Sequence, residues 1–449
     1  MSDLLGLGLS GLRAYRTALG TVGENVANAE TEGYTRRKAV LTPGVTGGAR
    51  LTPYYSDNFV FGGVQVQGIE RAWDTFKAAE MRHASSAAGR TGVREQWLTG
   101  IETALDDGPY GIGAKLTGFF NAGDDLAATP GDGFGRRQFL AKLDDVAGAF
   151  RTNAEALRRL STGMADAAAI EVDGLNNDVN ALAKLNAAIR VTSPGGSVRA
   201  AIEDDRDRLI NRIAERIGVV TSTNADGTTQ LTLADPTGTV LVSPTESSSF
   251  ALTVAADGRL GFQVTNSSGS AAVVPSSGKL AGLVEAADTA ATRLSELNML
   301  ALDFTAQLNA WSAAGLDPSG NPGGNLLEAP GGALTMRSLV TDPALVPANR
   351  GGTANGNLLA LDALRGSGGV ERRWTNLVAG HAQTLASAKS ENAASSAWRE
   401  NSFGALDEVT GIDLDREAAD LLRFQQAYSA AARIIQVGRE TVQDILNIF

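Results

Sequence analysis

Apolar or small residues recur at alternating spacings of three and four at both ends of this chain. Near the N-terminus these positions are Leu5, Gly8, Leu12, Tyr15, Leu19, Val22 and Val26. Near the C-terminus they are Leu421, Phe424, Tyr428, Ala431, Ile435, Gly438, Val442, Ile445 and Phe449. Such spacing puts one apolar stripe along one side of a helix. We therefore predict helices over 2–28 and 415–449, and we expect them to pair as a coiled coil.

Helical periodicity also dominates the middle of the chain. The predicted helical segments are 69–105 with an interruption at 89–92, 115–128, 135–190, 198–217, 279–314, and a last one from about 370. Residues 34–68 place β-branched and aromatic residues among glycines, which predicts an irregular extended segment with short strands.

Residues 219–275 differ in composition from the helical segments and are rich in Thr, Ser and Val. Turn signals at 224–227, 236–238 and 257–258 separate short alternating runs, which predicts a small antiparallel module of about five strands. The expected fold is therefore mainly α and multidomain, with an inserted β domain. We predict a terminal coiled-coil domain (1–35 and 408–449), an elongated helical domain with irregular and β segments (36–217 and 277–407), and a β-rich domain (218–276).

Composition and charge exclude several classes of protein. The net charge of −11 and the pI near 4.9 argue against a sequence-independent phosphate binder. The one dense basic run, Arg36-Arg37-Lys38, is interpreted as a solvated loop face. Because the chain has no cysteine, it has no disulfide, thiolate metal site or cysteine nucleophile. We also expect no membrane-spanning segment and no cleaved Sec signal.

Motifs that could carry chemistry each have a simpler explanation. Residues 6–11 match the dinucleotide fingerprint G-x-G-x-x-G, but only five residues precede them, too few for the required strand. Residues 317–328 place oxygen-bearing side chains at calcium-loop spacing, with Pro322 where the loop needs glycine, so we expect a surface loop.

The titratable residues also form no catalytic pattern. His83 and His381 are the only histidines, and both are expected on helix surfaces. The acidic pairs at 106–107, 124–125, 144–145 and 204–205 are interpreted as helix-end and i,i+4 electrostatics. We predict no catalytic residue, no cofactor, no metal site and no enzymatic activity.

The two chain ends resemble the axial proteins of the bacterial flagellum. Residues 10–19, 24–28 and 31–36, which include Asn25, Tyr34 and Arg36, resemble the N-terminal signature of the rod, hook and hook-associated proteins. Residues 411–421 and 424–428 resemble their C-terminal signature. The chain departs from that pattern at Glu32, where proline is usual, and at 23–24, where small polar residues are usual.

Internal stretches single out one branch of these proteins. Residues 116–121, 278–283 and 308–320 resemble the hook-associated protein 1 family. The resemblance implies a structural flagellar subunit that forms the hook–filament junction and is needed for filament assembly onto the hook. It also implies that the terminal helices form an inner tube and that the β module faces outward.

The resemblance also implies partners and a location. The partners are other copies of the chain in a ring or helical assembly, the hook protein, a second junction protein (hook-associated protein 3), and an export chaperone at the C-terminal helix. The location is the flagellum, reached through the flagellar type III export channel. Neither nucleic acid nor membrane is expected as a partner.

The apolar stripes at the chain ends are the predicted assembly interface. Its residues are Leu5, Leu12, Tyr15, Leu19, Val22, Val26, Leu421, Phe424, Tyr428, Ile435, Val442 and Ile445. Two alternatives stay open at this point. One is a hook or distal-rod protein, and the other, of a different class, is a secreted enzyme with an unrecognised site in the β module.

Overall fold

The computed structural model describes residues 2–44, 62–105, 107–235, 238–244 and 246–448. Helices dominate these residues, and small antiparallel sheets accompany them, so the predicted fold class is confirmed. The helices are α1 (Ser2–Ala27), α2 (Thr75–Leu105), α3 (Ile112–Ala128), α4 (Gly133–Val191), α5 (Ser197–Arg216), α6 (Lys279–Ala313), α7 (Gly356–Leu359), α8 (Val370–Thr410) and α9 (Leu414–Ile448). The 3-10 helices are η1 (Gly332–Thr335), η2 (Pro343–Leu345) and η3 (Ala360–Arg365).

The strands form four small sheets among the described residues. The strands are β1 (Arg37–Pro43), β2 (Val64–Arg71), β3 (Val219–Thr223), β4 (Thr229–Leu233), β5 (Val240–Val242), β6 (Ser249–Val254), β7 (Leu260–Asn266), β8 (Gly269–Val273), β9 (Leu327–Glu328) and β10 (Arg337–Ser338). Their pairings are β1-β2, β3-β4-β5, β6-β7-β8 and β9-β10. The predicted module of about five strands is thus six strands in two separate sheets. The short strands predicted within 45–61 lie outside the described residues.

The chain divides into two compact units. The first holds residues 1–85, 176–249 and 397–449, and the second holds 86–175 and 250–396. The long helices α2, α4 and α8 each contribute residues to both units. The domain boundaries predicted from the sequence remain a proposal.

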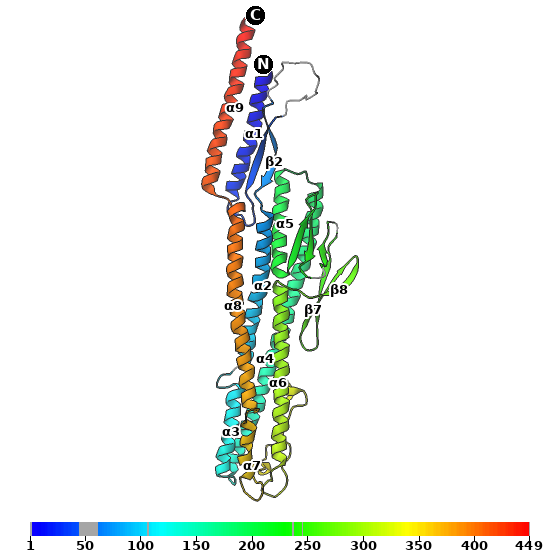
Figure 1. Cartoon of the computed structure of the whole chain (residues 1–449), viewed down its shortest axis with the longest axis vertical. Coiled ribbons are helices and arrows are strands. Elements are labelled where there is room, and N and C mark those ends of the chain that lie inside the picture. Colours follow the sequence, from blue (N-terminus) through cyan, green and yellow to red (C-terminus); the bar gives the residue numbers. More distant parts are fainter. Residues whose placement is uncertain (1, 45–61, 106, 236–237, 245, 449) are drawn as a thin grey trace. The chain divides into compact units, whose positions relative to one another are not determined.

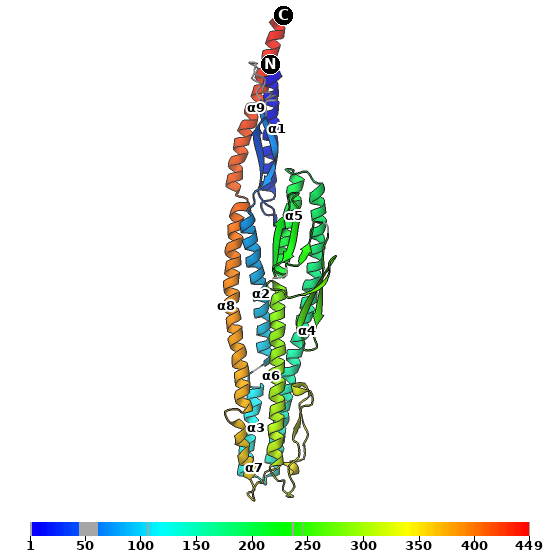
Figure 2. The same cartoon turned by 45° about the vertical axis from the view of Figure 1, so that its right-hand side comes forward.

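In the first unit, α1 and α9 run antiparallel, with both chain ends at the same end of the pair (Figures 1 and 2). The hairpin of β1 and β2 lies beside α1, and Arg37 faces Arg71 across it. The sheet β3-β4-β5 is held to α4 by Asn186, whose side chain donates to the Thr229 carbonyl (2.8 Å) and accepts from the Thr229 amide (3.0 Å). Asn186 is fully buried, so both backbone groups of Thr229 are satisfied inside the unit.

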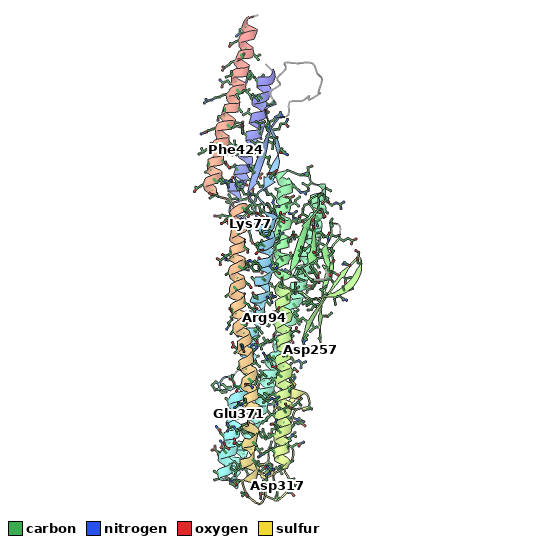
Figure 3. All side chains as sticks on the ribbon, viewed as in Figure 1. Lys77, Arg94, Asp257, Asp317, Glu371 and Phe424 are labelled. Atoms are coloured by element: carbon green, nitrogen blue, oxygen red, sulfur yellow. The ribbon has the colours of Figure 1, made fainter. Side chains whose placement is uncertain are left out.

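The second unit is built on the helices α2, α3, α4, α6 and α8, with an aromatic core. The rings of Phe119 and Phe139 lie 4.9 Å apart, and those of Phe119 and Phe304 lie 6.1 Å apart. All three side chains are fully buried, and burial of this kind is the main force that holds such a unit together. Around the core, ion pairs link neighbouring helices, for example Arg94 with Glu391 at 2.7 Å (Figure 3).

Two sequence predictions about secondary structure were wrong. The predicted interruption at 89–92 does not exist, because α2 runs unbroken through Gly89 and Gly92. A helix tolerates single glycines when tertiary packing supports it. Residue Ile69, expected on that helix, lies in β2 and donates its amide to the Gly195 carbonyl at 2.7 Å.

His381 also departs from the expectation of a surface residue, whereas His83 is exposed as predicted. His381 is almost fully buried in the second unit, and its Nε2 hydrogen-bonds the Leu98 carbonyl oxygen at 2.9 Å. Burial lowers the pKa of His381 because the charged imidazolium would lose its water.

Candidate functional site

Glycines lie at close contacts between α1 and α9. A Cβ added at Gly8 would lie 2.5 Å from Ile435 Cγ1, and one added at Gly11 would lie 3.2 Å from Ala431 Cβ. A Cβ at Gly438 would lie 3.2 Å from Leu5 Cδ2. The absence of side chains at these glycines therefore lets the two helix backbones approach closely.

The predicted interface residues fall into several classes of exposure. Val22 is buried, and Val26 and Tyr428 are exposed. The half-buried residues of the predicted interface are Leu5, Leu12, Tyr15, Leu19, Leu421, Phe424, Ile435 and Val442. The side chain of Ile445 lies outside the described residues. Figure 3 labels Phe424 on α9, and the Arg423 guanidinium lies 4.7 Å from the centre of its ring.

Exposed apolar side chains remain on both helices after they have paired. They are Leu4, Leu9 and Val26 on α1, and Leu414, Leu422, Tyr428, Ile434 and Val437 on α9. Most of these residues lie outside the predicted stripes. The stripes themselves are partly buried within the helix pair. An additional apolar surface is therefore available on the pair.

A buried polar cluster, which sequence reasoning missed, lies where α1 ends. Asn25 is fully buried, and its Nδ2 donates to the Arg37 carbonyl oxygen and to Glu417 Oε2, both at 2.9 Å. Its Oδ1 accepts from the Arg37 amide at 3.0 Å and from the Tyr34 hydroxyl at 3.1 Å. Burial raises the pKa of Tyr34 to about 12, so its hydroxyl remains a donor at neutral pH.

The basic run predicted to be solvated is largely inside this cluster. Arg36 Nε binds Glu417 Oε1 at 2.6 Å, and Glu417 has no exposed side-chain surface. Arg37 is 7% exposed and pairs with Asp204 of α5 at 3.1 Å. Only Lys38 of the run is exposed. The expectation was wrong because the buried carboxylates that pair with these arginines, Glu417 and Asp204, lie more than 160 residues away in the sequence.

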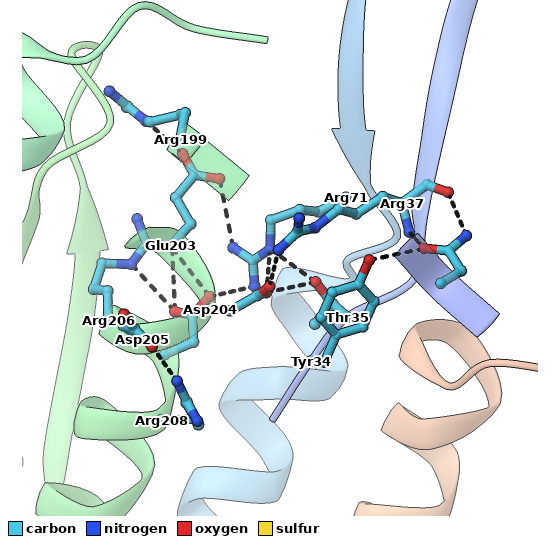
Figure 4. Close-up of polar contacts among 12 residues, drawn as sticks. Tyr34, Thr35, Arg37, Arg71, Arg199, Glu203, Asp204, Asp205, Arg206 and Arg208 are labelled. Carbon is cyan, nitrogen blue, oxygen red and sulfur yellow. Dashed lines mark hydrogen bonds and ion pairs between the residues drawn. The ribbon is translucent and has the colours of Figure 1, made fainter. Parts of the chain in front are cut away.

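The cluster continues through α5 to β2 and α2 (Figure 4). Asp204 accepts from Thr35 Oγ1 at 2.6 Å and pairs with Arg71 at 2.8 Å. Asp207 pairs with Arg71 at 2.9 Å and with Arg82 at 3.2 Å. Burial tends to lower the pKa of Arg71, but Asp207 and Asp204 outweigh burial and raise it. Asp204, interpreted from the sequence as part of helix-end and i,i+4 electrostatics, is thus a buried long-range partner.

The arginines that line one cleft beside the cluster already have carboxylate partners. A cleft of about 830 Å³ is lined in part by Arg71, Arg82, Arg199 and Arg206. Each of these arginines is already paired with a carboxylate of the chain. Among the described residues no group of three or more His, Cys, Asp or Glu side chains could hold a metal ion. The helices that the structure describes include none long and apolar enough to cross a membrane.

The loop with calcium-like spacing closes on itself. Asp317 Oδ1 accepts from the backbone amides of Ser319 and Asn321, both at 2.8 Å. These hydrogen bonds lower the pKa of Asp317, that from the Asn321 amide most strongly. The carboxylate therefore organises the turn. Residues 6–11, which match the dinucleotide fingerprint in sequence, lie inside α1.

Comparison with known proteins identifies the family of this chain. The family model "Flagellar hook-associated protein FlgK helical domain" matches residues 98–327. This chain belongs to the FlgK family. The matched region covers about half of the chain and includes both three-stranded sheets. It lies between the two terminal signatures, so it supports the resemblance independently of them.

Curated FlgK relatives agree with this assignment. The chain is 28% identical to flagellar hook-associated protein 1 of Salmonella typhimurium over 47% of the chain and 38% of that protein. It is 28% identical to the protein of the same name from Bacillus subtilis over 45% of the chain and 40% of that protein. The match thus spans less than half the length of these relatives. The solved flagellar hook junction protein FlgK of Burkholderia pseudomallei aligns with a TM-score of 0.49 at 21% identity, over 56% of the chain and 46% of that protein.

Proposed function

We propose that this chain is a structural subunit of the bacterial flagellum that forms the hook–filament junction and is needed for filament assembly onto the hook. Membership of the FlgK family supports the location in the flagellum. The observation that carries the mechanical role is the α1–α9 pair, which joins the two chain ends and leaves apolar side chains exposed on both helices.

In this proposal the helix pair contacts neighbouring copies in a ring or helical assembly. Burial of exposed apolar surface contributes about 25 cal/mol per Å², so even modest contacts repeated around a ring are substantial. The predicted interface residues take part together with the exposed residues Leu422, Ile434 and Val437. Helix α1, with three glycines in its first turns, is marginal in isolation.

Marginal terminal helices suit passage through a narrow export channel and folding on arrival. We therefore propose export by the flagellar type III route, with a chaperone at the C-terminal helix. The hook protein and a second junction protein (hook-associated protein 3) are the proposed neighbours along the flagellum. The role is structural, since the buried charged side chains are paired with one another around Asp204 and Asp207.

The test replaces the aromatic residues of α9 in cells that lack the native protein. F424D/Y428D is expected to abolish motility and filament growth, while circular dichroism shows that the rest of the chain stays helical. Q425D/Q426D is the matched control, because both glutamines are exposed on the same helix. Normal filaments in cells that make F424D/Y428D would refute the proposed assembly role.

Electron microscopy of cells that lack the protein separates the alternatives. Hooks without filaments support the junction protein, whereas missing hooks or rods support a hook or distal-rod protein. A variant that lacks 1–35 and 408–449 tests the enzyme alternative. A catalytic protein would keep its activity without these segments, whereas a junction protein loses assembly.

A further inference from the structure

The apolar contact between α1 and α9 does little to fix the position of one helix along the other. One side of each close contact is a glycine, at Gly8, Gly11 and Gly438, and small residues recur on α1 at Gly8, Gly11, Ala14 and Ala18. After a slide of one helical turn, Ala431 would again meet a small residue of α1. In coiled coils of this kind, a buried polar residue commonly specifies the register.

Glu417 is such a residue, and it is the buried acidic side chain of α9. It has no exposed side-chain surface. Arg36 Nε donates to Oε1 at 2.6 Å, and Asn25 Nδ2 donates to Oε2 at 2.9 Å. A slide of one turn moves the carboxylate by about 5.4 Å. Both hydrogen bonds would break, and an ionised carboxylate would remain buried without its partners, which is strongly unfavourable.

The two donors are themselves held in place by groups outside α9. The Arg36 amide donates to the Thr410 carbonyl, and the Ala72 amide donates to the Arg36 carbonyl, both at 2.8 Å. Asn25 holds the Arg37 backbone through both ends of its side-chain amide. Neither donor can therefore follow α9 if that helix slides.

We propose that Glu417 is the positioning residue that sets the register of α9 against α1 through Arg36 and Asn25. This inference rests on the proposed assembly role of the helix pair, because the register decides which apolar side chains of the two helices share one outer surface. Asp420 also contacts Arg36, at 3.2 Å, but it is partly exposed and does not contact Asn25. It serves as the matched control.

The test uses the fact that the chain contains no cysteine. G11C/A431C reports the native register, because an added Cβ at Gly11 lies 3.2 Å from Ala431 Cβ, close to the span of about 3.5–4.5 Å in a disulfide. G11C/I435C and G11C/A427C report slides of one turn in either direction. Each pair is combined with unchanged Glu417, E417A, E417Q or D420A, and disulfide yield is measured after mild oxidation.

With Glu417 present, the native pair is expected to cross-link in preference to both slid pairs. E417A is expected to shift the ratio of slid to native cross-links by at least about tenfold, the effect of losing one hydrogen bond to a charged group. E417Q keeps an acceptor for Arg36 but turns a donor toward Asn25 Nδ2, so it is expected to restore only part of the native preference. D420A removes a longer, partly exposed contact with Arg36 and is expected to shift the ratio much less than E417A.

Two outcomes would overturn the proposal. If E417A cross-links only in the native register, the apolar contact alone determines it. If E417A removes all three cross-links, Glu417 is needed for pairing rather than for register. The oxidation is done on the purified full chain and on flagella from cells that make it. Failure of the proposed assembly role would appear as normal filaments with F424D/Y428D, whereas the cross-link ratios would be unaffected.

Discussion

Arg37 and Asp204 form an ion pair of 3.1 Å in which both side chains are almost fully buried, although 167 residues separate them in the sequence. Asp204 also binds Thr35 and Arg71, so one carboxylate joins α5 to the hairpin of β1 and β2. Buried charges of this kind are costly unless each has its partners. The cluster therefore makes the packing of α5 depend on the turn that follows α1.

Removal of the Asp204 carboxylate should be strongly destabilising. D204A leaves buried Arg37 with only the half-exposed Glu24 as a carboxylate partner and removes one partner of Arg71, so we expect the free energy of unfolding to fall by about 3–5 kcal/mol. D205A is the control, because Asp205 is the next residue and its side chain is 49% exposed; we expect a change within about 0.5 kcal/mol. Urea unfolding followed by circular dichroism measures both. Equal effects of the two variants would contradict the role assigned to the buried cluster.

A large side chain at Gly8 should separate α1 from α9. The Cβ of G8L would lie 2.5 Å from Ile435 Cγ1, and such overpacking costs about 1–3 kcal/mol. G20L on the same helix meets nothing within 4 Å, and the gain in helix propensity should stabilise α1 by roughly 0.5–1 kcal/mol. Hydrogen exchange of the α1 and α9 amides distinguishes the two. Unchanged protection in G8L would show that the helices do not depend on this close contact.

The buried imidazole of His381 should make stability pH-dependent. Its pKa is lowered from the ordinary 6.5 in the folded chain, so below that pH the unfolded chain binds more protons. The free energy of unfolding should therefore decrease as pH falls below about 6.5. H381Q keeps a donor for the Leu98 carbonyl and should show a shallower loss between pH 7 and pH 5. H83Q changes an exposed residue and should show the same pH dependence of stability as the unmodified chain in urea titrations. The same pH dependence in H381Q would contradict the prediction.

The side-chain amide of Asn186 should be necessary for the β3-β4-β5 sheet to stay on α4. N186A leaves the amide and carbonyl of Thr229 without their partner inside the unit, with an expected loss of at least about 2 kcal/mol. N180A, on the same helix, removes only an exposed hydrogen bond from the Ser247 hydroxyl (2.7 Å) and should change stability by less than about 1 kcal/mol. Thermal unfolding measures both variants. A loss in N180A as large as that in N186A would point to a general effect on α4.

The sequence by itself determined the helices, the change to short strands after α5, and the family. Periodicity of three and four residues is a local property, so it predicted the helices α1 and α9. The terminal signatures and internal stretches indicated the flagellar family that the match over 98–327 confirms.

Only the tertiary structure decided which polar residues are buried and which residues meet. Asn25, Arg36 and Glu417 read as ordinary helix and loop polar residues until the two chain ends lie together. The glycines of α1 weaken an isolated helix, yet the structure uses Gly8 and Gly11 for close contact with α9. The physical reason is that burial and charge pairing depend on partners hundreds of residues away, and no local pattern records them.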